Sequence, residues 1–211
     1  ADDRREGNIL HMPSPNTLSA LWDAQSVAVV GASDREGSLG RLPIDFLTRF
    51  GYAGRILPIR PDGEPVAGLP SHISLAAAGE ATGPVDLAMI MVAAQRVPAA
   101  VADCIAAQVP VAIICTSGFA ETGEEGHRLQ DEVVALAREG GLRIVGPNCI
   151  GSVGAARGQV SSFSPLFSGS DTTLVSGPLG FVSQSGALGY GAVSLAWERG
   201  LGLGWVVNTG N

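Results

Sequence analysis

The chain contains no lysine, and all 13 of its basic residues are arginine. This absence excludes several classes of enzyme. A Walker A phosphate loop requires a lysine that reaches the phosphates, and enzymes that form a Schiff base require a lysine amine. Histidine and cysteine are also scarce, at three residues each, and have no paired spacing typical of a zinc finger or ribbon. We therefore expect no metal site.

Positive charge is in deficit, with 13 basic against 20 acidic residues and a formal net charge of −7. This balance argues against duplex DNA as a partner, because such binding depends on a cationic surface. No apolar run reaches the ~20 residues that span a bilayer, and the charged N-terminus does not resemble a secretory signal. We predict a cytoplasmic protein with reduced cysteines and no membrane partner. The composition, rich in arginine, alanine and glycine, is typical of a GC-rich bacterial genome.

Short apolar runs alternate with segments of helical period, which is typical of an α/β fold with a parallel sheet. Residues 1–16 are polar and are interpreted as a tail or linker, and residues 17–150 as one complete nucleotide-binding type of domain. Within that domain we predict strands at 26–31, 55–59, 85–92, 111–115 and 143–145, helices at 39–50, 97–107 and 123–139, and a short helix capped by Ser71.

Residues 151–172 are rich in glycine, serine and proline and are predicted to be an irregular connection. A strand at 178–183, a helix at 186–199 and a strand at 203–207 then begin a new pattern. A single strand–helix–strand unit cannot cover both faces of a parallel sheet. We therefore expect residues 173–211 to be the first part of an incomplete second α/β domain.

The first predicted strand runs into a loop of glycine and serine, GASDREGSLG, which begins at Gly31. Backbone amides of such a loop, at the start of a helix, can bind phosphate without a lysine. The dinucleotide fingerprint G-x-G-x-x-G is absent, because Gly31 is followed by Ala-Ser-Asp. The second strand leads into Arg60 rather than into the acidic residue that grips the ribose of NAD. We therefore favour a ligand that is phosphorylated on its ribose, such as NADP or coenzyme A.

Six segments follow one another along the chain: VAVVGAS, GYAGRILPIRP, GPVDLAMIMV, SGFAETGEEG, GPNCIG and FVSQSGALG. In this order they resemble the nucleoside-diphosphate-forming acyl-CoA synthetases, which include the ADP-forming acetyl-CoA synthetases and the α-subunit of succinyl-CoA synthetase. The resemblance extends over residues 18–211. It implies a Rossmann-like CoA-binding domain, followed by the start of a flavodoxin-like ligase domain.

The resemblance also implies particular site residues. For the CoA phosphates and the pantetheine arm, the candidate residues are Gly31, Ser33, Gly37, Ser38, Leu39, Arg60, Cys115, Thr116 and Ser117. Asn148 belongs to a GPN motif beside the thiol end of CoA. The segment Ser183-Gln184-Ser185-Gly186 matches a loop at a helix N-terminus that receives the phosphate of a phosphohistidine. Tyr190 matches a tyrosine that is associated with the substrate.

Two departures from the family pattern bear on function. The family usually has a lysine after the proline of the second strand, where Asp62 stands here, so Arg60 is the candidate replacement. The phosphorylated histidine of the family lies beyond residue 211, and none of His11, His72 and His127 occupies its place. The ligase reaction would therefore need that histidine, an ATP-grasp module and its ATP/ADP and Mg²⁺ from outside these residues, and we expect an oligomer.

Two other functions stay open at this point. The same domain pair occurs as the ligand-sensing part of protein acyltransferases, so the chain could be a non-catalytic sensor of CoA or acyl-CoA. An NADP-dependent Rossmann enzyme would explain Arg60 but not the GPN and SQSG segments. The serine turn at 183–186 lacks the glycines of a G-x-S-x-G nucleophile elbow, so we interpret it as an anion cradle and not as the site of a hydrolase.

Overall fold

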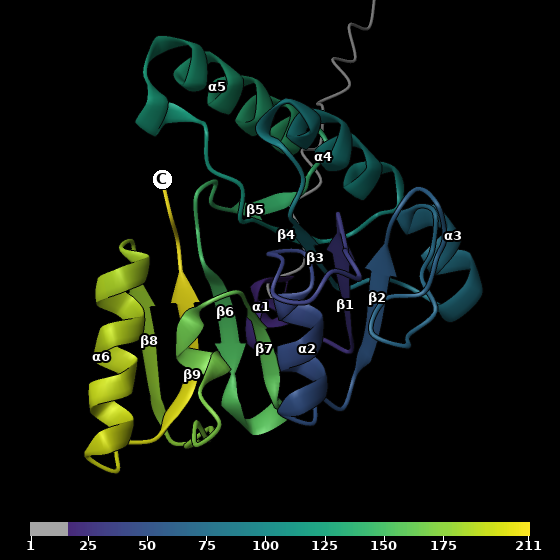
Figure 1. Cartoon of the computed structure of the whole chain (residues 1–211). Coiled ribbons are helices and arrows are strands. Elements are labelled where there is room, and N and C mark those ends of the chain that lie inside the picture. The colour runs from purple at the N-terminus through teal and green to yellow at the C-terminus, as the bar shows by residue number, and fades with distance from the viewer. Residues whose placement is uncertain (1–16) are drawn as a thin grey trace, which may run out of the picture.

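The computed structural model describes residues 17–211, so the predicted tail at 1–16 lies outside the described residues. The first of two sheets has five parallel strands in the order β2-β1-β3-β4-β5 (Figure 1). These strands are β1 (Ser26–Val30), β2 (Arg55–Ile59), β3 (Leu87–Ile90), β4 (Val111–Ile114) and β5 (Arg143–Val145). The predicted α/β fold is therefore confirmed, with the first sheet at the expected positions.

One face of this sheet is covered by three helices, α3 (Leu75–Thr82), α4 (Val97–Ala106) and α5 (Glu124–Glu139) (Figure 1). Ala28, Ala88 and Ala112 lie in register across β1, β3 and β4 and belong to the core under these helices. Every residue of β3 and β4 is buried. This agrees with the nearly continuous apolar sequence of strands that are covered on both faces.

The other face is covered by α1 (Ala20–Asp23), α2 (Leu42–Arg49) and part of the second sheet. Val27, Leu87 and Val111 share this core with Val207 of the second sheet. The ring of Trp22 stacks on that of Trp205, with ring centroids 5.0 Å apart and an interplanar angle of 20°. The two sheets are thus joined through a common apolar layer.

The second sheet has the strand order β7-β6-β9-β8. It consists of β6 (Gly151–Gly154), β7 (Gln159–Ser162), β8 (Leu179–Ser183) and β9 (Leu203–Asn208), with α6 (Gly186–Glu198) connecting β8 to β9. Strands β8 and β9 are parallel, whereas β6 is antiparallel to both β7 and β9. The predicted strand–helix–strand unit is present, and it extends a sheet that starts with a hairpin.

The prediction of an irregular connection is wrong for residues 151–162, which form the β6–β7 hairpin. Each of these strands carries a single valine, so the sequence has no apolar alternation to reveal it. The other buried positions are glycines and polar residues, and two of the polar side chains are satisfied by α1. Ser152 donates to the carbonyl of Leu21 at 2.5 Å, and the Gln159 amide donates to the carbonyls of Ala20 and Leu21.

Smaller differences concern the helix ends. Ser74, not Ser71, caps α3, and its hydroxyl accepts a hydrogen bond from the amide of Ala77. The helix starts later than predicted because the backbone of His72 still pairs with the end of β2, donating to Pro58 and accepting from Arg60.

Short 3₁₀ turns occupy Thr17–Ser19, Ala94–Arg96, Ala120–Thr122, Ala155–Arg157 and Pro165–Ser168. In the described part of the chain, no helix has the length and apolar character needed to cross a membrane.

Candidate functional site

The order of the first sheet itself indicates where a ligand binds. The chain adds β2 on one side of β1 and then crosses to add β3 on the other side. In such open α/β sheets, ligands bind at the carboxyl edge where the strand order reverses. At this edge the amides of Gly31 and Ala32 donate to the carbonyl of Ile59, the last residue of β2. The predicted residues Gly31 and Arg60 therefore lie side by side.

The β1–α2 loop, residues 31–41, folds tightly onto its own start. A Cβ on Gly40 would lie 2.3 Å from the carbonyl oxygen of Gly31, so only glycine permits this approach. The Ser33 hydroxyl accepts from the amide of Arg35, and the Ser38 hydroxyl donates to the carbonyl of Arg35 at 2.7 Å. The structure thus brings together the predicted residues of this loop, with Gly37 and Leu39 exposed.

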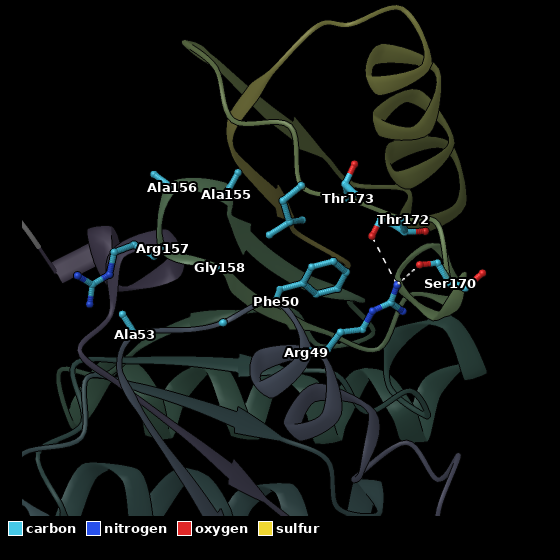
Figure 2. Close-up of a pocket in the computed structure, with 12 residues that line it drawn as sticks. Arg49, Phe50, Ala53, Ala155, Ala156, Arg157, Gly158, Ser170, Thr172 and Thr173 are labelled. Atoms are coloured by element: carbon cyan, nitrogen blue, oxygen red, sulfur yellow. Dashed lines mark hydrogen bonds between the residues drawn. The ribbon is translucent and has the colours of Figure 1, made fainter.

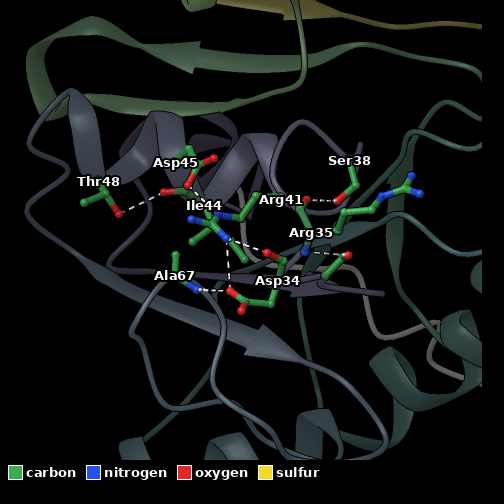
Figure 3. A network of polar contacts seen from close by, with 9 residues as sticks. Asp34, Arg35, Ser38, Arg41, Ile44, Asp45, Thr48 and Ala67 are labelled. Carbon is green, nitrogen blue, oxygen red and sulfur yellow. Dashed lines mark hydrogen bonds and ion pairs between the residues drawn. The ribbon is translucent and has the colours of Figure 1, made fainter.

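Asp34, which pairs with Arg41, links this loop to the segment that follows β2 (Figure 3). The Arg41 guanidinium lies 3.0 Å from a carboxylate oxygen of Asp34 and 2.6 Å from one of Asp45. The same Asp34 oxygen accepts a hydrogen bond from the amide of Ala67 at 2.8 Å. The hydrogen bond that Arg41 donates to Asp45 is the main cause of a raised pKa of Arg41, which keeps the guanidinium charged. Sequence reasoning missed this clamp, because its partners come from three separate segments.

Arg60 is also paired. Its Nε lies 2.5 Å from Oδ1 of Asp62, and its terminal amino group donates to Oδ2. The hydrogen bond with Arg60 lowers the pKa of Asp62. Arg41 and Arg60 are therefore both engaged by aspartates, whereas Arg35 lies within the loop and is exposed.

Cys115, Thr116 and Ser117 follow β4 at the same edge of the sheet. The hydroxyl of Thr116 donates to the carbonyl of Val92, after β3, and its own carbonyl accepts from the amide of Asn148. Thr116 thereby ties the ends of β3 and β4 to the GPN loop. Ser117 is exposed and Cys115 is 8% exposed.

The thiols of Cys115 and Cys149 at this edge are buried in the core. The hydrogen bond with Cys149 and burial both raise the pKa of Cys115 well above its ordinary value. Cys149 is 1% exposed, and its thiol lies 3.8 Å from the carbonyl oxygen of Val145. Neither is placed as an accessible nucleophile.

The GPN loop and the SQSG loop meet in one pocket of about 370 Å³. The pocket is lined by Asn148, Ile150, Gln184, Ser185, Gly186, Ala187, Gly210 and Asn211. The structure therefore brings Asn148 together with three of the four residues predicted for the phosphate cradle. The fourth, Ser183, supports the turn through a hydrogen bond from its hydroxyl to the carbonyl of Ser185, 2.9 Å long.

The start of α6 provides donors in this pocket. Ser185 is the N-cap, and its hydroxyl accepts from the amide of Leu188 at 3.3 Å. Within residues 17–211, the amides of Gly186 and Ala187 have no hydrogen-bond acceptor. Free amides and the positive end of a helix dipole favour an anion. A Cβ on Gly186 would lie 2.1 Å from a side-chain carbon of Ile150, so a larger residue here would displace the Ile150 side chain.

Sequence reasoning missed Asn208, which joins the two loops. This residue is 2% exposed at the end of β9. Its Oδ1 accepts from the amide of Ile150 at 2.6 Å, and its Nδ2 donates to the carbonyls of Ser183 and Gln184 at 2.9 and 3.0 Å. Its sequence context, an apolar strand ending in VVN, gives no signal of this role.

Tyr190 is not among the residues that line the pocket. It is 4% exposed, and its ring packs edge-on against Phe167, with the centroids 5.6 Å apart. Burial raises its pKa. Its predicted contact with substrate stays a prediction.

A larger cavity, of about 820 Å³, contains none of the predicted site residues (Figure 2). It lies between the end of α2 and the β6–β7 turn, with Arg49 and Arg157 among its lining residues. The Arg49 guanidinium is engaged by backbone carbonyls, including those of Phe167 and Gly169 at 2.8 and 2.6 Å. Arg157 lies 3.2 Å from a carboxylate oxygen of Asp23. These contacts explain the arginines as parts of the fold.

The chain is also similar in sequence to several proteins of known function. The chain is 36% identical over 197 residues to the α-subunit of acetate–CoA ligase (ADP-forming) I of Pyrococcus furiosus, covering 92% of the chain and 41% of the relative. It is 31% identical over 195 residues to the ADP-forming 4-hydroxybutyrate–CoA ligase of Nitrosopumilus maritimus, covering 92% of the chain and 27% of the relative. The chain thus spans less than half the length of either relative.

Among solved structures, the fold is similar to the dinucleotide forming acetyl-coenzyme A synthetase 1 of Ca. Korarchaeum cryptofilum in complex with phosphate and ADP. The TM-score is 0.81 at 32% identity, covering 92% of this chain and 39% of that one. The curated relatives are named as ligases, which does not favour the sensor interpretation. The sequence model of the family described as "CoA binding domain" matches residues 25–155. The chain therefore belongs to the CoA-binding domain family and is homologous to the ADP-forming acyl-CoA ligases.

Proposed function

We propose that this chain is the CoA-binding portion of an ADP-forming acyl-CoA synthetase. One observation carries the proposal: the GPN and SQSG loops form one pocket, joined through Thr116 to the edge of the sheet that holds the β1–α2 loop. A ligand with a nucleotide at one end and a long arm can lie along this edge. Family membership and the ligases named above support the same ligand.

Each part of the edge has its role in this proposal. The β1–α2 loop and Arg60 hold the nucleotide end, and the segment 115–117 lies along the pantetheine arm. Asn148 lies at the thiol end. The free amides at the start of α6, with Ser183 and Gln184 shaping the turn, hold the phosphate that enters or leaves.

The reaction proposed for the whole protein converts acyl-CoA, phosphate and ADP into a carboxylic acid, CoA and ATP. Phosphate attacks the thioester carbonyl, the CoA thiolate leaves, and the acyl phosphate passes its phosphoryl group through a histidine to ADP. His72 and His127 lie away from the pocket lining, so that histidine, the ATP-grasp module and Mg²⁺ would come from outside residues 17–211. The donor set here, backbone amides and small polar side chains, fits phosphate.

We also propose that residues 173–211 belong to a flavodoxin-like ligase domain, connected to the CoA-binding domain of residues 17–150 through 151–172. Within that connection, the β6–β7 hairpin pairs with β9 and belongs to the same sheet as β8 and β9. Large apolar side chains that are about half or more exposed support further covering of this unit. They are Leu179, Val182, Leu188, Leu195 and Leu201. An ATP-grasp domain or subunit, an oligomeric enzyme and a cytoplasmic location complete the proposal. A bacterial source stays a prediction from composition, since the homologues are mostly archaeal.

Isothermal titration of the 211-residue chain with CoA tests the binding proposal. We expect CoA to bind, ADP to bind more weakly because it lacks the arm, and NADP⁺ to give no signal. A chain that binds NADP⁺ but not CoA would contradict the proposal and favour the Rossmann oxidoreductase.

A further inference from the structure

The nucleotide end of the candidate site carries several carboxylates, although we expect it to receive phosphate. Arg41 is held by Asp34 and Asp45. Arg60, the arginine that follows β2, is held by Asp62. An arginine at the end of the second strand is the residue that accommodates a ribose phosphate in this type of fold. Here that arginine already has an anionic partner from its own loop.

The pair between Arg60 and Asp62 lies near the surface and is supported by further hydrogen bonds. Both carboxylate oxygens of Asp62 face the guanidinium, at 2.5 Å each, in the two-point arrangement that makes such pairs strong. Oδ1 of Asp62 also accepts from the amide of Glu64 at 3.1 Å. The backbone of Arg60 is fixed as well, because its amide donates to the carbonyl of His72. The aspartate is therefore held in position against the arginine.

Two other carboxylates add to the negative charge that acts on Arg60. Asp34 and Glu64 both act on the Arg60 guanidinium. A phosphate that approaches Arg60 must therefore displace the carboxylate of Asp62. The negative charges of Asp34 and Glu64 also oppose its binding.

We propose that Asp62 is an internal counter-ion that competes with the ribose phosphate of the ligand for Arg60, so that the site discriminates weakly between CoA and 3′-dephospho-CoA. This inference rests on the proposed function, because it assumes that CoA occupies the edge of the first sheet. It assigns Asp62 the role of a specificity-determining residue. The rest of the ligand, the diphosphate and the arm, supplies most of the affinity.

The substitution Asp62→Asn tests this role with little change of structure. The asparagine keeps an oxygen for the Glu64 amide but removes the charge that holds Arg60. Glu64→Gln is the matched control, because it removes an equal charge nearby and leaves the Arg60–Asp62 pair intact. Arg60→Gln combined with Asp62→Asn removes the cation itself. Each variant is titrated calorimetrically with CoA and with 3′-dephospho-CoA.

For the unsubstituted chain we expect dissociation constants for the two ligands within about threefold of each other, the range of a weak exposed contact. In Asp62→Asn, the affinity for CoA rises about tenfold, as expected for one charge-assisted hydrogen bond, and that for 3′-dephospho-CoA stays unchanged. The gain disappears in the double variant, and Glu64→Gln gives less than about a threefold change.

Two results would overturn the inference while leaving the proposed function intact. One is a strong preference of the unsubstituted chain for CoA that Asp62→Asn does not increase. The other is an equal gain for both ligands in Asp62→Asn, because that reflects general charge and not competition for Arg60. If neither ligand binds any variant, the proposed function fails, and the inference fails with it.

Discussion

Asn208 is predicted to hold the candidate phosphate pocket together, and its substitution should loosen both loops at once. The side chain is 2% exposed and makes three hydrogen bonds, to the amide of Ile150 and to the carbonyls of Ser183 and Gln184. Asn208→Leu leaves these three backbone groups without partners. A buried polar group without a partner costs about 1–3 kcal/mol, and partial access of water reduces the sum, so we expect a loss of roughly 2–4 kcal/mol.

Asn208→Asp separates hydrogen bonding from packing. The two side chains have the same shape, but the carboxylate at neutral pH can accept from Ile150 and cannot donate to Ser183 or Gln184. It also places a negative charge against two carbonyl oxygens. We therefore expect Asn208→Asp to destabilise the chain at least as much as Asn208→Leu, whereas a role in packing alone predicts little change.

Urea unfolding measures the free energy, and hydrogen exchange measures where protection is lost. Amides of Ile150, Leu188 and Gly189, which are hydrogen-bonded here, should exchange faster in both variants, while those of β1 and β3 stay protected. A chain with Asn208→Asp that stays within about 0.5 kcal/mol of the unsubstituted chain, the usual range for a surface substitution, would refute this reasoning.

Two further predictions concern the core. Gln159→Leu should lower the free energy of unfolding by roughly 2–4 kcal/mol, because the buried amide of Ala24 and the carbonyl of Ala20 lose this partner, whereas the carbonyl of Leu21 keeps Ser152. The exposed Gln25→Leu is the control and should change the free energy by less than about 0.5 kcal/mol in the same urea titration. Burial raises the pKa of Cys104 to about 12 and that of Cys115 well above its ordinary value, so neither thiol should react with iodoacetamide at pH 8 in the folded chain. Mass spectrometry should find both alkylated after unfolding, and rapid labelling of the folded chain would contradict their burial.

The first sheet was predictable because its strands are short apolar runs that are buried on both faces. The runs around Val27, Leu87 and Val111 each stand out in the sequence, and their order along the chain sets the α/β pattern. The β6–β7 hairpin was not predictable in this way. Its buried positions include Ser152 and Gln159, which become stable in the core only because α1, distant in the sequence, offers them partners.

In the candidate site, too, some parts were predictable from the sequence and others were not. The glycine-rich loop, the GPN segment and the SQSG turn were visible as motifs, and the structure brings Asn148 beside Gly186. The residues that hold these motifs in place were not visible. Asn208 acts across more than 50 residues on Ile150, and the pairing of Arg60 with Asp62 depends on side-chain directions that no spacing rule gives.

The central claim, that the carboxyl edge of the first sheet binds CoA, is tested most directly by mapping the ligand on the chain. Amide chemical shifts of the ¹⁵N-labelled protein are followed by NMR during titration with CoA. The account predicts the largest changes in the β1–α2 loop, in the segment 115–117 and at Asn148. Changes confined to the cavity beside Arg49 and Arg157, or no changes at all, would contradict it.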